Sequence, residues 1–225
     1  EVLKTLTSSG TTSNKVSKIF LDKESARLQT KALIKIMQSF LGKNRLPMLI
    51  IDIPSVLKNK TKFSARSAGV MGLMNFGRKH TFILDDEMNL DVKALEDFLK
   101  NYQNEKFLMF GFTFMVWEYF YKALKKQGLD LNLSNGILFH SGGWKKLQNK
   151  AVSNEIFKKS FKDDFKLKHI HNFYGMVEQI GSIFVECERG HLHTPNFADI
   201  IIRDSFSLKP LDKNQIGLIE LVSII

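Results

Sequence analysis

Cysteine is nearly absent from this chain of 225 residues, since Cys187 is the only one. A single thiol excludes an intrachain disulfide, and it also excludes zinc sites built from CxxC pairs. Scarce cysteine is typical of proteins in a reducing compartment, and the chain has no charged and then apolar signal sequence at its start. We therefore expect a cytoplasmic location.

Long apolar runs are also missing, because no stretch approaches the roughly 18 to 20 residues that a membrane-spanning helix requires. We expect a soluble protein with no membrane span. Proline (4 residues) and tryptophan (2) are scarce, whereas phenylalanine (19) is abundant and 44% of the chain is hydrophobic. This composition argues against disorder and provides enough apolar surface for one substantial core, or for a large domain with a small appendage.

Negative charge is in the minority, and the formal net charge is +10. A basic protein favours anionic partners, which include nucleic acid, nucleotides, an acidic carrier protein and a membrane surface. The lysines are scattered, and the sequence contains neither an arginine-rich arm nor the aromatic and basic pattern of RNA-binding modules. We therefore predict no nucleic-acid partner and interpret most of the lysines as solvated helix faces.

The order of apolar patterns predicts the fold class. Residues 22–42 carry apolar side chains at helical spacing, with Asp22 as the expected N-cap and Gly42 at the end. Strand and helix patterns then alternate, with strands at 47–54, 80–85, 106–112, 136–143 and 168–175 and helices at 91–102, 114–128 and 153–161. Such alternation predicts an α/β fold with a mostly parallel sheet flanked by helices, whose ligands bind beyond the carboxyl ends of the strands.

The pattern changes at Gly181, after which every apolar segment is strand-like and is separated from the next by a short polar turn. We expect an α/β nucleotide-binding core in residues 1–180, followed by a β-rich segment of the same domain in residues 181–225.

A run of hydroxyl side chains, TSSGTTSNK, begins at residue 7. Short hydroxyl side chains compete for backbone hydrogen bonds, so the run predicts a loop rather than a helix or a buried strand. It does not have the spacing of a P-loop. Its hydroxyl and amide donors could nevertheless surround a polyphosphate, with Lys15 or Lys18 offsetting the charge.

Two predicted strands end in residues that core packing does not require. LFHSGGWKK ends with Gly142 and Gly143, which let a flat ligand approach the backbone closely. NFYGMVEQIG contains Tyr174 and Gly175 and continues to Glu178; a ring there can stack on a base, and a carboxylate can hold a metal ion. The alternative interpretations are an ordinary core residue for Tyr174 and a solvated turn carboxylate for Glu178.

Taken in order, five segments resemble acyl-protein synthetases of the bacterial bioluminescence fatty-acid reductase type, within the adenylate-forming (acyl-CoA synthetase-like) superfamily. They are TSSGTT, SARSAGVMGLMNFG, FHSGGWKK, HNFYGMVEQIG and VECERGHLHTPNFADIIIRD. The phenylacetate-CoA ligase group is the next most similar. The resemblance covers nearly the whole chain and implies part of the large N-terminal domain of these ligases. The family's hinge and its C-terminal lid, which carries a catalytic lysine, have no counterpart before Ile225, so we expect the lid to be absent from this chain.

The resemblance implies a role for each motif residue, with ATP and Mg²⁺ as cofactors. Gly142 and Gly143 would border the adenine, Tyr174 would stack on it with Gly175 as a further cofactor-binding residue, and Glu178 would position Mg²⁺ and take part in catalysis. Thr11 and Lys15 are the other two expected catalytic residues. The remaining phosphate-binding residues would be Thr7, Ser8, Ser9, Gly10 and Thr12. The sequence departs from the family at Ser13, where glycine is usual, and it lacks the Pro-Lys that commonly follows, so both Lys15 and Lys18 stay candidates for the phosphates.

The implied activity is ATP-dependent activation of a long-chain fatty acid as acyl-adenylate, followed by transfer to a protein thiol on an acyl-protein reductase or an acyl carrier. Residues 70–76 and 109–117 could line the acyl pocket, although buried core is the simpler interpretation of each residue. Two alternatives stay open, an acyl- or aryl-CoA ligase and a non-catalytic domain that binds a nucleotide or a partner.

Cys187 and the histidines have several interpretations. Cys187 could accept the acyl group, or could bind a metal with His191 and His193, but a buried inert thiol is the simpler interpretation. His169 and His171 share one face of a regular strand and are interpreted as core residues. By position, His140 and His193 lie closer to the predicted pocket, without an assigned role.

Overall fold

The computed structural model describes residues 2–7, 17–58, 65–176 and 181–224. The chain divides into two compact units, which we call the terminal unit and the central unit. The terminal unit comprises Glu1–Phe40, Tyr174–Cys187 and His191–Ile225, and the central unit comprises Leu41–Phe173 and Glu188–Gly190.

A parallel sheet forms the centre of the central unit, with the strand order β4-β3-β5-β6-β7. Its strands are β3 (Leu46–Ile50), β4 (Gly77–Phe82), β5 (Phe107–Phe112), β6 (Gly136–Ser141) and β7 (His169–Gly175). Parallel neighbours need crossover connections, and helices supply them here. The predicted fold class, a mostly parallel sheet flanked by helices, is therefore confirmed.

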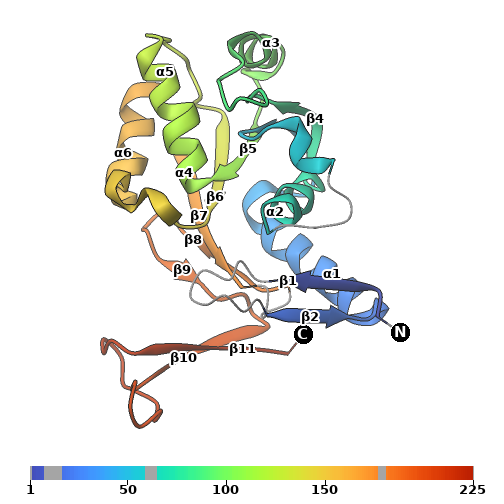
Figure 1. Cartoon of the computed structure of the whole chain (residues 1–225), viewed down its shortest axis with the longest axis vertical. Helices are drawn as coiled ribbons and strands as arrows, with labels where there is room; N and C mark the ends of the chain where they lie inside the picture. The colour runs from blue at the N-terminus through green and yellow to red at the C-terminus, as the bar shows by residue number, and fades with distance from the viewer. Residues whose placement is uncertain (1, 8–16, 59–64, 177–180, 225) are drawn as a thin grey trace. The chain divides into compact units, whose positions relative to one another are not determined.

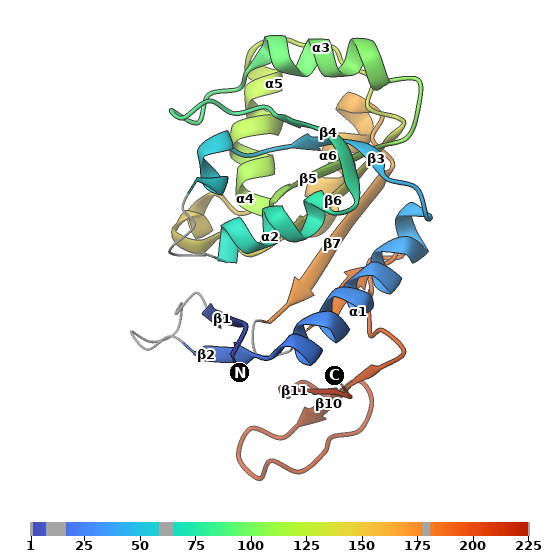
Figure 2. The same ribbon diagram turned by 90° about the vertical axis from the view of Figure 1, so that its right-hand side faces the viewer.

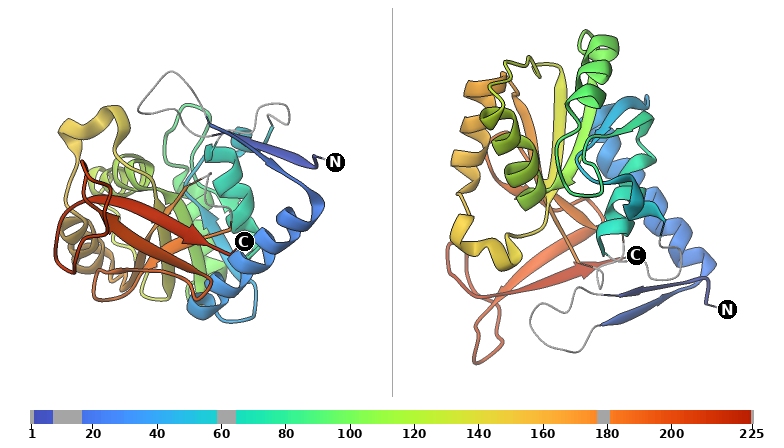
Figure 3. Two further views of the ribbon diagram at one scale, coloured as in Figure 1. Left: turned by 90° about the horizontal axis from the view of Figure 1, so that it is seen from below. Right: turned by 45° about the horizontal axis from the view of Figure 1, so that its top comes forward.

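The crossover helices lie on both faces of this sheet. They are α2 (Ala65–Met74), α3 (Val92–Tyr102), the continuous run of α4 (Thr113–Met115), η2 (Val116–Tyr121) and α5 (Lys122–Lys126), and α6 (Asn154–Phe165). A short 3₁₀ turn, η1 (Pro54–Leu57), follows β3, and another, η3 (Lys145–Lys150), follows β6. The strands lie between α2 on one side and α3 and α5 on the other (Figure 1, Figure 2). In two views α5 and α6 run side by side (Figure 1, Figure 3).

The alternation of side chains along β5 explains why both faces are covered. Phe107 and Met109 belong to the core cluster beneath α3, α5 and α6, while Leu108 and Phe110 point to the opposite face. All four side chains are fully buried. On that opposite face Gly69 of α2 lies against the rings of Phe110 and Phe112. A continuous apolar run is typical of a strand buried on both faces, as the sequence predicted.

The predicted helix ends are confirmed where the sequence carries capping signals. α1 (Lys23–Leu41) begins after Asp22, whose Oδ1 accepts a hydrogen bond from the Ser25 amide at 2.7 Å, and ends at Gly42 with φ of 79°. Asp91 caps α3 and Ser153 caps α6 in the same way, accepting from amides at 2.9 and 3.2 Å. Short polar side chains therefore set where these helices start.

The helix predicted at 114–128 contains a segment that the pattern did not indicate. Its middle, η2, is a π-helix, in which backbone hydrogen bonds join residues five positions apart instead of four. Trp117 stacks on Tyr121 with ring centroids 4.4 Å apart, and Glu118 pairs with Lys122 at 2.8 Å and with Lys150 at 2.9 Å. The π-helical segment is therefore accompanied by ring stacking and an ion pair within the helix and by an ion pair to η3.

The terminal unit contains α1 and three pairs of antiparallel strands. β1 (Lys4–Thr7) pairs with β2 (Lys18–Leu21), β8 (Ile183–Glu186) with β9 (Leu192–His193), and β10 (Ala198–Arg203) with β11 (Leu218–Ser223). The β10 and β11 pair is visible from below in Figure 3. The β-rich segment predicted after Gly181 is confirmed, whereas the β1–β2 pair and α2 were not predicted.

Across the described residues, every helix is too short or too polar to cross a membrane.

Candidate functional site

The glycine pair lies where the sequence placed it, at the carboxyl ends of the parallel strands. The last paired residues of β5 and β6 are Phe112 and Ser141, and Gly142 follows at once. Gly142 has φ of 81°, and a Cβ there would lie 3.1 Å from Cδ1 of Phe112. Around Gly143, a Cβ would meet no described atom within 4 Å. One glycine therefore makes a turn against an aromatic ring, and the next presents open backbone.

These two environments predict that replacing each glycine with alanine lowers the free energy of unfolding by a different amount. Gly142→Ala puts a Cβ in a left-handed conformation and against Phe112, so we expect the free energy of unfolding to fall by about 1 to 2 kcal/mol. Gly143→Ala, the matched control, is expected to cost less than about 0.5 kcal/mol. Urea unfolding of both variants measures the difference, and equal losses would contradict this description of the turn.

Tyr174 and Gly175 end β7 and belong to the terminal unit. The Tyr174 side chain is 42% exposed, and its ring centroid lies 6.4 Å from that of Phe184. The interpretation of Tyr174 as an ordinary core residue is therefore wrong. An exposed ring at the end of a strand has a face available for stacking, which is what the predicted adenine contact requires.

The hydroxyl-rich loop and the predicted metal ligand lie outside the described residues. This applies to Ser8, Ser9, Gly10, Thr11, Thr12, Lys15 and Glu178. Two flanking residues are described: Thr7 is the last residue of β1 rather than a loop residue, and it is paired in register with Lys18, the first residue of β2. The assignments of these residues to ATP and Mg²⁺ stay predictions.

A buried polar pair, which the sequence did not indicate, joins β6 to the residue after β5. His140 is 1% exposed and Thr113 is 8% exposed, and Nδ1 of His140 lies 2.9 Å from Oγ1 of Thr113. The imidazole stacks on Phe157 of α6 with centroids 4.5 Å apart. Its Nε2 is buried and has no hydrogen-bond partner within the described part of the chain. Burial, with smaller contributions from Lys158 and His171, lowers the pKa of His140 to about 3.

Because the pKa of His140 is lowered on folding, its contribution to stability is lost as the pH falls. Below its ordinary pKa of 6.5 the unfolded chain takes up a proton that the folded chain excludes. We expect the free energy of unfolding to drop by up to about 1.4 kcal/mol per pH unit between pH 6 and 5, above the range in which most carboxylates titrate. Urea titrations across this range should show a smaller slope in His140→Phe or His140→Asn, and an unchanged slope in both would contradict the assignment.

A buried charge lies at the carboxyl end of β3. Asp52 is 1% exposed, and its Oδ2 accepts a hydrogen bond from Nε of Arg66 at 2.9 Å, while its Oδ1 accepts from Nη2 of Arg66 and from the Ile53 amide. Arg66 belongs to the first turn of α2, so this ion pair fastens α2 to the sheet. The sequence contained a signal for it, since Asp52 follows a buried apolar run and a buried carboxylate requires a partner.

The stretches expected to line an acyl pocket are mostly buried. Val70 and Leu73 are 1% and 4% exposed, and Met109, Met115 and Val116 are fully buried. The simpler interpretation, core packing, is confirmed for these five side chains, and an acyl pocket along these stretches stays a prediction.

The other histidines and Cys187 lie in separate surroundings. His171 is 6% exposed and packs on Phe139 with centroids 5.1 Å apart, so it is a core residue as predicted. The His169 side chain is 48% exposed, so its prediction as a core residue is wrong. Cys187 is half-buried, and its amide donates to the carbonyl of His191 at 2.9 Å. In the described ranges no three His, Cys, Asp or Glu side chains gather closely enough to hold a metal ion, which argues against a site at Cys187 and His191.

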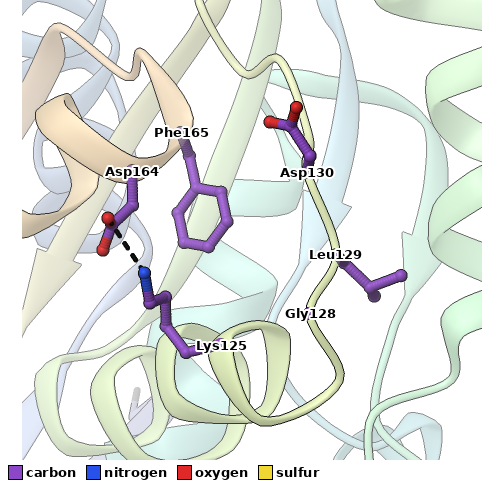
Figure 4. Close-up of a pocket in the computed structure, with 6 residues that line it drawn as sticks. All are labelled: Lys125, Gly128, Leu129, Asp130, Asp164 and Phe165. Atoms are coloured by element: carbon purple, nitrogen blue, oxygen red, sulfur yellow. Dashed lines mark hydrogen bonds and ion pairs between the residues drawn. The ribbon is translucent and has the colours of Figure 1, made fainter.

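A pocket of about 220 Å³ lies elsewhere in the central unit (Figure 4). It is lined by Lys125, Gly128, Leu129, Asp130, Asp164 and Phe165. Lys125 pairs with Asp164 at 3.0 Å across it. The residues come from the carboxyl ends of α5 and α6, which lead into the amino ends of β6 and β7. The pocket therefore lies at the amino ends of the strands, whereas the glycine pair lies at their carboxyl ends, where open α/β sheets normally bind their ligands.

Comparison with solved structures identifies the fold. The chain matches ATP-bound MatB from Rhodopseudomonas palustris over 99% of its length, with a TM-score of 0.63 and 13% identity, and covers 39% of that protein. It matches the amide bond synthetase McbA from Marinactinospora thermotolerans over 97% of its length (TM-score 0.63, 13% identity, 40% of that protein covered). It matches the luciferase-like enzyme from the nonluminescent mealworm Zophobas morio over 99% of its length, with a TM-score of 0.61 and 17% identity, and covers 48% of that protein. At these identities the likeness defines the fold, that of the N-terminal domain of adenylate-forming ligases.

The chain belongs to the acyl-protein synthetase family LuxE, which it matches over residues 1–225. The resemblance predicted from the sequence motifs is therefore confirmed. The chain spans about two fifths to one half of the solved proteins it matches, and no curated protein matches it.

Proposed function

We propose that this chain carries the nucleotide and fatty-acid sites of an enzyme that activates a long-chain fatty acid with ATP and passes the acyl group to a protein thiol. The observation that supports this most strongly is the match to the acyl-protein synthetase family over the whole chain. Under this proposal, residues 1–180 and 181–225 work as one nucleotide-binding domain in the cytoplasm.

The surroundings of the glycine pair, Gly142 and Gly143, are compatible with a bound nucleotide base. Open backbone at Gly143 leaves room for the flat face of an adenine, and the exposed ring of Tyr174 at the end of β7 is of the type that stacks on a base. In this proposal Gly142 and Gly143 border the adenine, Tyr174 stacks on it, and the hydroxyl-rich loop, including Thr11 and Lys15, binds the phosphates. Mg²⁺ would be held by Glu178, because hard divalent cations prefer carboxylate oxygen.

The chemical step follows from the charges involved. The carboxylate oxygen of the fatty acid attacks the α-phosphorus of ATP, the bond to the β,γ-phosphates breaks, and pyrophosphate leaves with the electron pair. Both reactants are anions, so the chain must align them and offset the charge that grows on the leaving group. Mg²⁺ held by Glu178 would offset part of that negative charge, and the loop hydroxyls and Lys15 would supply hydrogen-bond donors. The acceptor thiol would belong to a partner reductase or an acyl carrier.

The experiment is ATP–pyrophosphate exchange measured with and without a long-chain fatty acid. Exchange that requires the fatty acid and Mg²⁺, and that falls by about 100-fold in Glu178→Gln, would support the proposal. Added coenzyme A distinguishes acceptors, because faster AMP release with coenzyme A would indicate a CoA ligase instead. Neither exchange nor ATP binding, with retained binding of a protein partner, would indicate a non-catalytic domain.

A further inference from the structure

The Thr113 and His140 pair lies one residue from the point where β5 and β6 separate. Phe112 and Ser141 form the last backbone pair of these strands. Thr113 directly follows Phe112, and His140 directly precedes Ser141. The hydrogen bond of 2.9 Å between Oγ1 of Thr113 and Nδ1 of His140 therefore ties the first residue of α4 to the end of β6, two residues before Gly142.

Packing alone does not account for a polar pair at this position. The imidazole stacks on Phe157, a member of the apolar core cluster, and its second nitrogen is buried without a partner among the described residues. A half-satisfied buried polar group is costly, and an apolar side chain of similar size would be tolerated at least as well. Stability therefore does not explain why the side chains at positions 113 and 140 are polar.

Residues close to Thr113 in the sequence are in contact with residues that follow His140. Phe112, just before Thr113, has its ring against Gly142, with Cδ1 3.1 Å from the position a Cβ would occupy. Trp144 meets Trp117 edge to face, with ring centroids 6.5 Å apart. The segment from Gly142 to Trp144 is thus held at both ends by residues of β5 and the helix after it. The Thr113 and His140 bond is a directional contact between side chains, whereas the aromatic contacts tolerate sliding.

We propose that Thr113 and His140 are positioning residues that fix the backbone of Gly142 and Gly143 as a preformed edge for the nucleotide base. The identity of the ligand, ATP, rests on the function proposed above. Neither side chain touches the base; both act through the glycine backbone. A preformed edge strengthens binding because the segment is already ordered before the ligand arrives.

The test uses four forms of this chain: the unaltered chain, Thr113→Val, Thr113→Ser and the double variant Thr113→Val with His140→Phe. Valine has the shape of threonine without its hydroxyl group, and serine keeps the hydroxyl group. The double variant removes both polar groups and so avoids leaving either one unpaired. Two readouts are taken at pH 7.5: hydrogen exchange at the amides of Gly142 and Gly143 without ligand, and the Kd for Mg·ATP by calorimetry.

In the double variant we expect a melting temperature at least equal to that of the unaltered chain, exchange at the two glycine amides about tenfold faster, and ATP binding at least about tenfold weaker. Thr113→Val should show the same losses with a lower melting temperature, and Thr113→Ser should restore all three values. Unchanged exchange and an unchanged Kd in the double variant would overturn the proposal, since the pair would then be packing only. If exchange responds but the unaltered chain does not bind ATP, the function proposed above fails and the positioning of the glycine backbone stands.

Discussion

Replacing Arg66 with alanine is expected to lower the free energy of unfolding by about 3 kcal/mol, because it leaves the carboxylate of Asp52 buried without its counterion. Asp52 is 1% exposed and receives two hydrogen bonds from the Arg66 guanidinium. Burying an uncompensated charge costs far more than losing a surface ion pair, since water cannot replace the missing partner. The Arg66 side chain is 32% exposed, so some water can enter, which keeps the expected loss at the lower end of the range for buried pairs.

Arg27→Ala is the matched control for this prediction. Arg27 pairs with Glu24 on the surface of α1, where the two side chains are 49% and 63% exposed. Its loss is expected to change the free energy of unfolding very little in the same urea titration, because water solvates the carboxylate that stays behind. Adding Asp52→Asn to Arg66→Ala should recover part of the loss, because the orphaned charge is then removed. Equal costs for the two arginines, or no recovery, would contradict the assignment of Asp52 and Arg66 as a buried ion pair.

Gly111→Ala is expected to destabilise the chain by about 3 kcal/mol or more, because there is no space for a methyl group. A Cβ at this position in β5 would lie 2.7 Å from Cγ2 of Val116 and 2.9 Å from Cβ of Ile51. Both neighbours are fully buried, and branched side chains cannot swing away from the contact. Val116 begins the π-helical segment, so the helix after β5 must shift outwards or the strands must separate.

Gly143→Ala serves as the control, since a Cβ there would meet no described atom within 4 Å. Thermal or urea unfolding of both variants tests the prediction. A Gly111→Ala variant as stable as the Gly143→Ala variant would mean that the contact of β5 with Val116 and Ile51 is looser than described. Because Gly111 precedes Phe112 and Thr113, we also expect Gly111→Ala to weaken nucleotide binding.

The sequence predicted the parallel sheet because buried parallel strands have an unmistakable composition. The apolar runs that became β3, β5 and β6 stand between polar segments, and only a strand covered on both faces tolerates so few polar residues. Asp22 and Gly42 marked the ends of α1 correctly because capping is a local interaction between residues a few positions apart.

Elements with weak local signals were not predicted. α2 contains two glycines and a serine in ten residues, a poor composition for a helix, and its burial of Val70 and Leu73 against the sheet compensates for that. β1 has four residues and is recognisable only from its pairing with β2. The π-helical turn in η2 could not be predicted either, because an apolar period of 3.6 residues does not distinguish it from an α-helix.

The sequence indicated local features where the residues are consecutive and missed pairs of residues that are distant along the chain. Gly142 and Gly143 stand next to each other after a strand, and the open backbone that this predicts is present at Gly143, whereas Gly142 lies against the ring of Phe112. The Thr113 and His140 pair is 27 positions apart and the Asp52 and Arg66 pair 14 apart, so only the folded chain reveals them. Residues in the hydroxyl-rich loop and Glu178 rest on the family resemblance alone.

The central claim is that this chain holds a nucleotide site and an acyl site together. The most direct test is the thermal shift produced by a non-hydrolysable long-chain acyl-adenylate mimic, compared with the same adenosine compound without its acyl chain. A ligand that binds the native state raises the melting temperature in proportion to its affinity, so the difference between the two shifts isolates the acyl site. We predict a shift from the adenosine compound and a clearly larger one from the acyl-adenylate mimic. No shift from either compound would contradict the claim and favour a domain that only docks a partner.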